Sequence, residues 1–213
     1  HNAARGAVRR QLPALASASD TESRAFATKT SPDMTTHLIA LDWGTSSLRA
    51  YLMDDVSRVV DERRFPYGVM SLPDGGFAEA FNQACGDWHA TAPQVPVIAC
   101  GMVGSRQGWI EAPYAPCPAG LDALANALAP LEVTPVEGNG ELTIHVVPGL
   151  SIDPVGDVPD VMRGEETQIA GLLYQSPDFG GTVCLPGTHT KWVRVADRAI
   201  TSFETCMTGE QFG

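Results

Sequence analysis

The sequence predicts an α/β fold in which two related domains surround a cleft. Three short apolar strands with tight turns open the patterned sequence, helices and strands then alternate, and three more strands close it. The second set of strands begins like the first. Residues 41–47 (LDWGTSS) and residues 185–191 (LPGTHTK) each join a strand end to a Gly-Thr turn rich in hydroxyl groups. A plan that starts twice favours two domains of similar construction.

The first half of the pattern predicts a meander, then a helix and a strand. Strands are expected at residues 37–43, 48–53 and 59–65, and their short connections are typical of antiparallel pairing. Apolar side chains at helical spacing predict a helix over residues 77–89. Residues 95–100 form an apolar run that predicts the next strand.

The second half predicts two helices and a second meander. A helix rich in Ala and Leu is expected at residues 121–131, a strand at residues 142–148 and a helix at residues 165–174. The strands of the second meander are expected at residues 182–185, 191–195 and 199–203.

The two meanders divide the chain into a first domain, residues 34–164, and a second, residues 165–213. The sequence ends where a helix is expected to follow the second meander. We therefore expect a complete first domain and a truncated, only partly present second domain. Residues 1–33, rich in Ala, Ser, Thr and Arg and without periodicity, are predicted to be a disordered N-terminal extension, with an organelle transit peptide as the alternative.

Composition excludes several classes of function. The net charge of −11, from 25 acidic and 14 basic residues, argues against nucleic acid as a partner. No apolar run approaches the roughly 20 residues of a membrane-spanning helix. The cysteines are scattered and never in C-x-x-C spacing, which favours reduced thiols in a cytoplasmic protein over a zinc site. They are Cys85, Cys100, Cys117, Cys184 and Cys206.

The turn after the first strand has the residue types of a phosphate site. Asp42, at the strand end, can hold Mg²⁺ directly or through water. Gly44 allows close backbone approach to a phosphate, and Arg49 can neutralise charge on a transferred phosphoryl group. An ordinary tight turn is the alternative. The hydroxyl donors are those of Thr45, Ser46 and Ser47.

The turn between the first two strands of the second meander offers the same kinds of group. Gly187 and Thr188 correspond to the Gly-Thr pair of the first turn, and His189 and Lys191 add nitrogen donors. Two such hairpins facing each other can clamp a nucleotide tail. The alternative is a hairpin turn with His189 on the surface.

Two acidic residues and a Gly-rich loop complete the candidate site. Glu165 or Glu166, where a helix begins between the halves, can accept a proton from a sugar hydroxyl, although acidic residues also favour helix starts through the dipole. The loop after residue 100 suits a ligand with a carboxylate, which Arg106 can bind with its guanidinium fork, unless this loop is purely structural. Its candidate substrate-binding residues are Ser105, Arg106, Gln107, Trp109, Glu111 and Tyr114.

Four blocks of sequence together resemble the 2-dehydro-3-deoxygalactonokinases, members of the sugar kinase and actin-like ATPase superfamily. The blocks are IALDWGTSSLRAYL, CGMVGSRQGWIEAPYAPCPA, VPDVMRGEETQIAG and LPGTHTKWV. The resemblance implies an actin-like ATPase (ribonuclease H-like) fold. It also implies phosphorylation of the 6-hydroxyl of 2-dehydro-3-deoxy-D-galactonate with ATP and Mg²⁺, in D-galactonate catabolism.

The resemblance also implies roles for residues. Residues 42–47 are similar to the first phosphate motif of the superfamily and residues 187–191 to the second. Related kinases place an Asp base just after a Gly, where this sequence has Glu165, and Glu166 is the alternative.

Other functions remain open at this point. The family extends for roughly a hundred further residues, so the alternatives are an inactive fragment that at most binds a sugar acid, and a kinase for a related sugar acid. An actin-like regulator is a third, which the polar loop argues against. A homodimer is left open.

Overall fold

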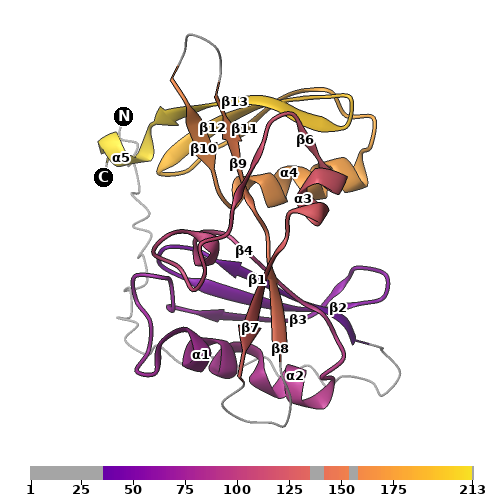
Figure 1. Cartoon of the computed structure of the whole chain (residues 1–213), viewed down its shortest axis with the longest axis vertical. Helices are drawn as coiled ribbons and strands as arrows, with labels where there is room; N and C mark the ends of the chain where they lie inside the picture. The colour runs from indigo at the N-terminus through magenta and orange to yellow at the C-terminus, as the bar shows by residue number, and fades with distance from the viewer. Residues whose placement is uncertain (1–35, 135–141, 154–157, 213) are drawn as a thin grey trace, which may run out of the picture.

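The computed structural model describes residues 36–134, 142–153 and 158–212, which form two lobes joined at a waist (Figure 1). Residues 1–33, predicted to be a disordered extension, lie outside the described residues. No helix in the described part of the chain is long and apolar enough to cross a membrane.

A six-stranded mixed sheet forms the lower lobe in Figure 1, with the strand order β3-β2-β1-β4-β8-β7. Strands β1, β2 and β3 pair antiparallel, which confirms the predicted meander, and β4 and β8 extend the sheet in parallel from β1. The strands are β1 (Thr36–Trp43), β2 (Leu48–Asp54), β3 (Val59–Phe65), β4 (Val97–Cys100), β7 (Ala129–Val133) and β8 (Leu142–Val146).

Side-chain alternation buries one face of the central strands β1 and β2. Ile39, Leu41 and Trp43 of β1 are buried on it, as expected when successive side chains point to opposite faces. Helices α1 (Gly76–Phe81) and α2 (Asp87–Thr91) cover that face (Figure 1). A π-helical turn at Asn82–Gly86 joins them, so the predicted helix at residues 77–89 is present but interrupted.

The predicted helix at residues 121–131 is wrong in its second half. Helix α3 ends at residue 126 (Leu121–Asn126), and β7 then pairs antiparallel with β8 at the edge of the sheet. Pro130 disfavours a helical residue before it, and proline is tolerated on an edge strand. Ala129 and Val133 are buried while Pro130 is exposed, so the segment has the two-residue period of a strand.

The upper lobe contains a four-stranded antiparallel sheet, β11-β12-β13-β6, and a three-stranded sheet, β10-β9-β5. The pairing of β11, β12 and β13 confirms the second meander. Strands β5, β6, β9 and β10 were not predicted, because two to four residues carry no measurable period. The elements are β5 (Tyr114–Pro116), β6 (Ala119–Gly120), β9 (Gly149–Ile152), β10 (Asp160–Met162), α4 (Glu165–Gln175), β11 (Gly181–Leu185), β12 (His189–Ala196), β13 (Ala199–Met207) and α5 (Gly209–Phe212).

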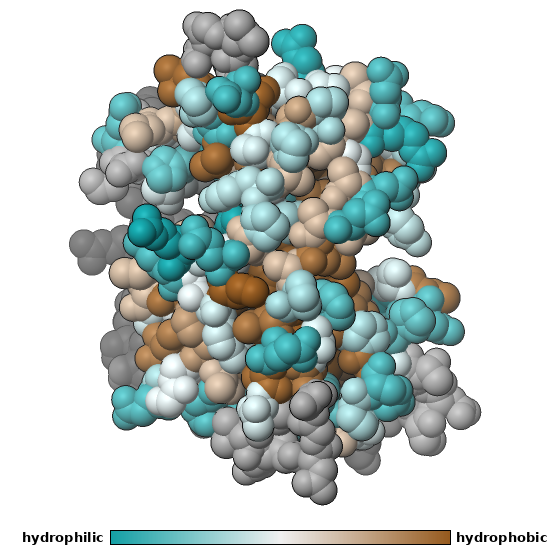
Figure 2. All heavy atoms as spheres, viewed as in Figure 1, coloured by the Kyte–Doolittle hydropathy of each residue, from teal (hydrophilic) through white to brown (hydrophobic). Residues whose placement is uncertain are grey.

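The upper lobe has its own hydrophobic core, formed where α3 and α4 pack beneath the four-stranded sheet (Figure 1). Leu150 and Met162 belong to this core together with Ile169, Val193 and Phe203. Several segments that precede residue 164, among them α3, β9 and β10, therefore pack with the upper lobe. The predicted domain boundary at residue 164 stays a prediction. Figure 2 shows hydrophobic residues along the waist and over much of the lower lobe on this face.

Two glycines bring the lobes together at the waist. Gly101, after β4, has φ of 90°, and a Cβ there would lie 2.8 Å from the carbonyl oxygen of Trp43. Gly164, before α4, has φ of 108°, and a Cβ there would lie 3.5 Å from the Cα of Gly101. Both positive φ values favour glycine. The ends of β1 and β4 thus meet the start of α4, and this junction positions the site.

Candidate active site

A cleft of about 310 Å³ lies at this junction. It is lined by the end of β1 and its turn, the loop after β4, the first turn of α4, and the β11–β12 turn. The two hairpin turns that the sequence singled out therefore lie on one cleft, although 143 positions separate Thr45 from Thr188 (188 − 45). Glu165 lines the same cleft.

The first turn is held rigidly by its own backbone. The N–H of Gly44 donates to the carbonyl oxygen of Ser47 (2.9 Å), and the N–H groups of Val69 and Met70 donate to the carbonyl oxygens of Gly44 and Thr45 (3.0 and 3.2 Å). Thr45 is exposed, and its hydroxyl has no partner among the described residues. A fixed turn with an open hydroxyl suits phosphate binding.

Asp42 faces the cleft and forms an ion pair with Arg49 on the neighbouring strand. Arg49 Nη1 lies 2.8 Å from Asp42 Oδ2, and both side chains are 42% exposed. Their backbones are paired across β1 and β2, which places the two side chains on the same face of the sheet. Asp42, Gly44 and Thr45 line the cleft. Arg49 is not part of the lining, but it contacts the lining residue Asp42. Ser46 and Ser47 also lie outside the lining.

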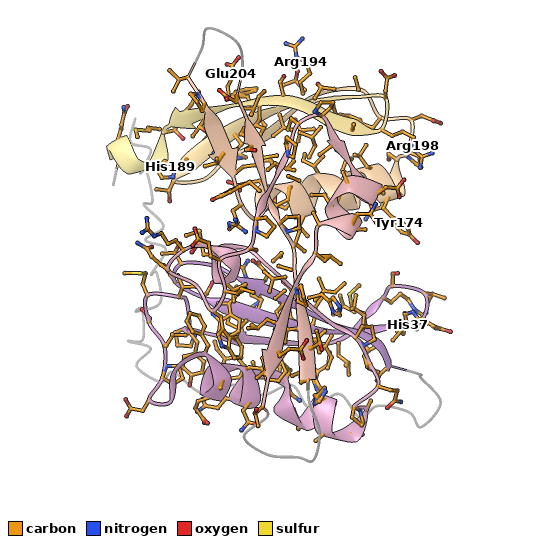
Figure 3. All side chains as sticks on the ribbon, viewed as in Figure 1. His37, Tyr174, His189, Arg194, Arg198 and Glu204 are labelled. Atoms are coloured by element: carbon orange, nitrogen blue, oxygen red, sulfur yellow. The ribbon has the colours of Figure 1, made fainter. Side chains whose placement is uncertain are left out.

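The second turn contributes to the same cleft. Gly187, Thr188 and His189 line it. Thr208 Oγ1 lies 3.4 Å from the carbonyl oxygen of Gly187, and a Cβ on Gly209 would lie 2.8 Å from the same oxygen. Close packing against the chain after β13 therefore supports this turn. Figure 3 shows His189 at the left, on the side of the upper lobe that faces the lower lobe.

Lys191 is buried and does not reach the cleft. Its Nζ donates to the carbonyl oxygen of Val161 (2.6 Å) and to the Thr205 hydroxyl, and it lies 3.7 Å from Asp160 Oδ1. Thr205 also donates to Asp160 (2.6 Å). This network joins β10 to β12 and β13, so the ammonium group is occupied within the upper lobe.

The two candidate glutamates occupy different environments. Glu165 lines the cleft, whereas Glu166 is fully buried. Glu166 accepts hydrogen bonds from the N–H of Gly164 (2.7 Å) and from Thr167 Oγ1 (3.1 Å). Burial raises the pKa of Glu166 to about 7, although these hydrogen bonds oppose the rise.

The loop residues predicted to bind substrate do not line the cleft. Trp109 packs in the lower core, where it stacks on Phe77 with ring centroids 5.6 Å apart and meets Trp43 edge-on at 5.9 Å. The side chains of Arg106, Gln107 and Glu111 are exposed. Of the remaining two, Tyr114 lies against Arg163, and Ser105 follows Gly104, which packs against Arg163.

Arg163 is a cleft residue that the sequence analysis did not select. Its Nη2 donates to the carbonyl oxygen of Ala112 (2.8 Å), and its guanidinium lies 4.4 Å from the ring centroid of Tyr114. The one signal in the sequence was its position immediately before the Gly-Glu pair. Met102 and Gln168 are further lining residues that carried no signal.

The carboxylates of the cleft fit Mg²⁺ only if a substrate supplies further ligands. No cluster of three or more His, Cys, Asp or Glu residues able to hold a metal occurs within residues 36–134, 142–153 and 158–212. Mg²⁺ is commonly held by one or two carboxylates together with substrate phosphates and water. Asp42, half exposed beside a phosphate-type turn, meets that description.

Two proteins similar in sequence are 2-dehydro-3-deoxygalactonokinases by name. One, from Rhizobium meliloti and assigned this activity, is 39% identical over 173 residues, which are 81% of this chain and 54% of the relative. The other, from Escherichia coli, is 37% identical over 177 residues, 83% of this chain and 56% of the relative. The chain therefore spans about half the length of the relatives it matches.

A solved structure and a family pattern agree with these relatives. The crystal structure of a Sinorhizobium meliloti protein assigned as a 2-dehydro-3-deoxygalactonokinase superposes with a TM-score of 0.72 at 38% identity, covering 83% of this chain and 56% of that one. This likeness confirms the predicted α/β fold class. The sequence pattern of the 2-keto-3-deoxy-galactonokinases matches residues 42–213. This chain belongs to the 2-keto-3-deoxy-galactonokinase family.

Proposed function

We propose that the protein phosphorylates the 6-hydroxyl of 2-dehydro-3-deoxy-D-galactonate with ATP, in D-galactonate catabolism. The observation that carries this proposal is the cleft shared by both hairpin turns and Glu165. Since the chain spans about half the length of the matched relatives, the activity is proposed for the whole protein. A cytoplasmic location fits a small-molecule kinase, and the homodimer stays a prediction.

Phosphoryl transfer needs positioning and charge stabilisation more than covalent chemistry from the protein. Thr45 and Thr188 line the cleft from the two hairpin turns, and their hydroxyls can hold phosphate oxygens. Arg49, paired with Asp42, can turn to the transferred group when phosphate charge competes for it. Asp42 would hold Mg²⁺, which supplies neutralisation of phosphate charge.

Glu165 is the proposed general base. It lines the cleft at the start of α4, where a sugar hydroxyl can approach it, and carboxylates accept a hydroxyl proton in such transfers. Glu166 is enclosed, and its carboxylate is committed to Gly164 and Thr167. Its proposed contribution is to hold the backbone from which Glu165 projects.

The first test is isothermal titration of the 213-residue chain with 2-dehydro-3-deoxy-D-galactonate and then with Mg·ATP, together with an assay for ADP release. Binding of the acid, and ADP release that requires it, would support the proposal. ADP release with a different sugar acid would contradict the substrate alone. Absence of binding and of ADP release in both this chain and the whole protein would contradict the kinase itself.

A further inference from the structure

Two nitrogens of the Arg163 guanidinium are buried and unpaired. Nε and Nη1 are closed off from solvent and have no hydrogen-bond partner, while Nη2 is bonded to the Ala112 carbonyl. Within the described residues Arg163 forms no ion pair, whereas Arg49, Arg58, Arg63 and Arg64 each have a carboxylate partner. Burying polar nitrogens of a cation without a hydrogen-bond partner or a counter-charge is costly. The cost indicates that an anion completes this site.

A second unpaired group lies on the adjoining loop. The hydroxyl of Ser105 is also buried without a partner. The preceding residue, Gly104, is packed against Arg163, since a Cβ on Gly104 would lie 2.8 Å from Nη1. Ser105 and Arg163 are the residues with buried, unpaired side-chain polar atoms in the described part of the chain, and the loop that carries Ser105 packs against Arg163 through Gly104. Buried donors without a partner on Arg163 and on the loop packed against it favour a polar ligand that satisfies them.

The site also has a platform and an opening. The ring of Tyr114 lies 4.4 Å from the guanidinium carbon and forms a platform for the fork. Arg163 lines the cleft beside Gly164 and Glu165. One hydrogen bond, to Ala112, is all that the guanidinium makes among the described residues, so turning it toward the cleft breaks that bond and the contact with Tyr114 and frees the fork.

We propose that Arg163, assisted by Ser105, binds the carboxylate of the sugar-acid substrate. This inference rests on the proposed function. The substrate has its carboxylate and its reacting hydroxyl at opposite ends, so separate residues must take each end. Arg163 and Glu165 flank Gly164 and both line the cleft, which gives one residue for each. Arg106, the arginine suggested by the sequence, is exposed and outside the cleft lining.

The test compares the acid with its neutral primary amide by titration into the full 213-residue chain. We expect the unmodified chain to bind the acid about tenfold or more tightly than the amide, because charge-assisted hydrogen bonds are strong. Arg163→Gln should weaken acid binding by about the same factor, leave amide binding unchanged, and abolish the preference. Arg163→Lys, which keeps the buried charge and the fold, should weaken acid binding less, since an ammonium lacks the fork.

The controls separate this inference from the proposed function. Arg194→Gln removes the same charge from the outer face of the upper lobe (Figure 3), and it should keep the full acid preference. A preference retained in Arg163→Gln, or lost in Arg106→Gln instead, would overturn the role of Arg163 and leave the kinase standing. Equal binding of acid and amide by the unmodified chain would overturn it also. Binding of neither compound by this chain or by the whole protein would contradict the proposed substrate itself.

Discussion

Glu166 accepts a 2.7 Å hydrogen bond from the backbone N–H of Gly164, through a carboxylate that is fully buried. Gly164 has φ of 108°, a conformation that favours glycine, and it lies against Gly101 of the lower lobe. The hydrogen bond therefore fixes the backbone where the two lobes meet. As a consequence, adjacent glutamates take different places: Glu166 lies inside and Glu165 in the cleft.

The Glu166 carboxyl should make stability depend on pH. Burial raises its pKa in the folded state from 4.5 to about 7, so the folded protein holds this proton more tightly than the unfolded chain. The stabilisation is complete below the unfolded pKa and is lost as pH rises through about 7, by roughly 3 kcal/mol. Urea unfolding of the chain and of Glu166→Gln across this range should show the loss only in the unmodified protein. An equal slope in both would contradict the assignment.

Glu165→Gln should lower kcat of the whole protein by roughly 10²–10⁴-fold with little change in substrate binding, because it removes the proton acceptor but keeps the shape of the side chain. Glu166→Gln is the matched control, since its amide oxygen can still accept the Gly164 bond. Steady-state ADP release measures both. A larger loss of kcat in Glu166→Gln than in Glu165→Gln would reverse the proposed roles.

Asp42→Ala should abolish the Mg²⁺-dependent part of ATP binding and of turnover, because it removes the proposed metal ligand. The fold should stay intact, since Asp42 is half exposed and the substitution removes only a surface ion pair with Arg49. Titration with ATP in the presence and absence of Mg²⁺ measures this dependence. The melting temperature serves as the control for folding. An unchanged effect of Mg²⁺ in the variant would exclude Asp42 as the metal ligand.

Gly101→Ala should lower the free energy of unfolding by about 1–3 kcal/mol, because φ of 90° is strained for alanine and the Cβ would lie 2.8 Å from the Trp43 carbonyl oxygen. Gly171→Ala, in the interior of α4 with no atom within 4 Å of its Cβ position, should instead raise it by about 0.5–1 kcal/mol. Denaturant unfolding of both variants compares them. Equal effects would mean that the junction tolerates a side chain at Gly101.

Lys191→Met should cost about 1–3 kcal/mol of stability, because it leaves Asp160 and Thr205 without their buried cation, and it should leave ATP affinity close to normal. The double variant with Asp160→Asn should be less destabilised than the sum of the two single changes, since each removes the same interaction. If Lys191→Met lowered ATP affinity tenfold with unchanged stability, the nucleotide role predicted from the sequence would hold instead.

The strands and turns could be predicted because their signals are local. The bounds of β3 agree with the prediction at residues 59–65, and both Gly-Thr turns lie between antiparallel strands as expected. The second half of the helix predicted at residues 121–131 was wrong, because an Ala- and Leu-rich run fits both the 3.6-residue period of a helix and the two-residue period of a strand. Pro130 was the signal that should have divided this run into a helix and a strand. The short strands of the upper lobe depend on distant partners and leave no local pattern.

The sequence alone determined the two meanders, the paired turns and the family to which the chain belongs, because these depend on local patterns and on the order of motifs. Only the tertiary structure decided which of those groups meet in the cleft. It places Glu165 and Arg163 at the cleft, and it commits Lys191 and Trp109 to internal contacts. The physical reason is that the direction and burial of a side chain depend on elements far away along the chain, which close packing brings against it.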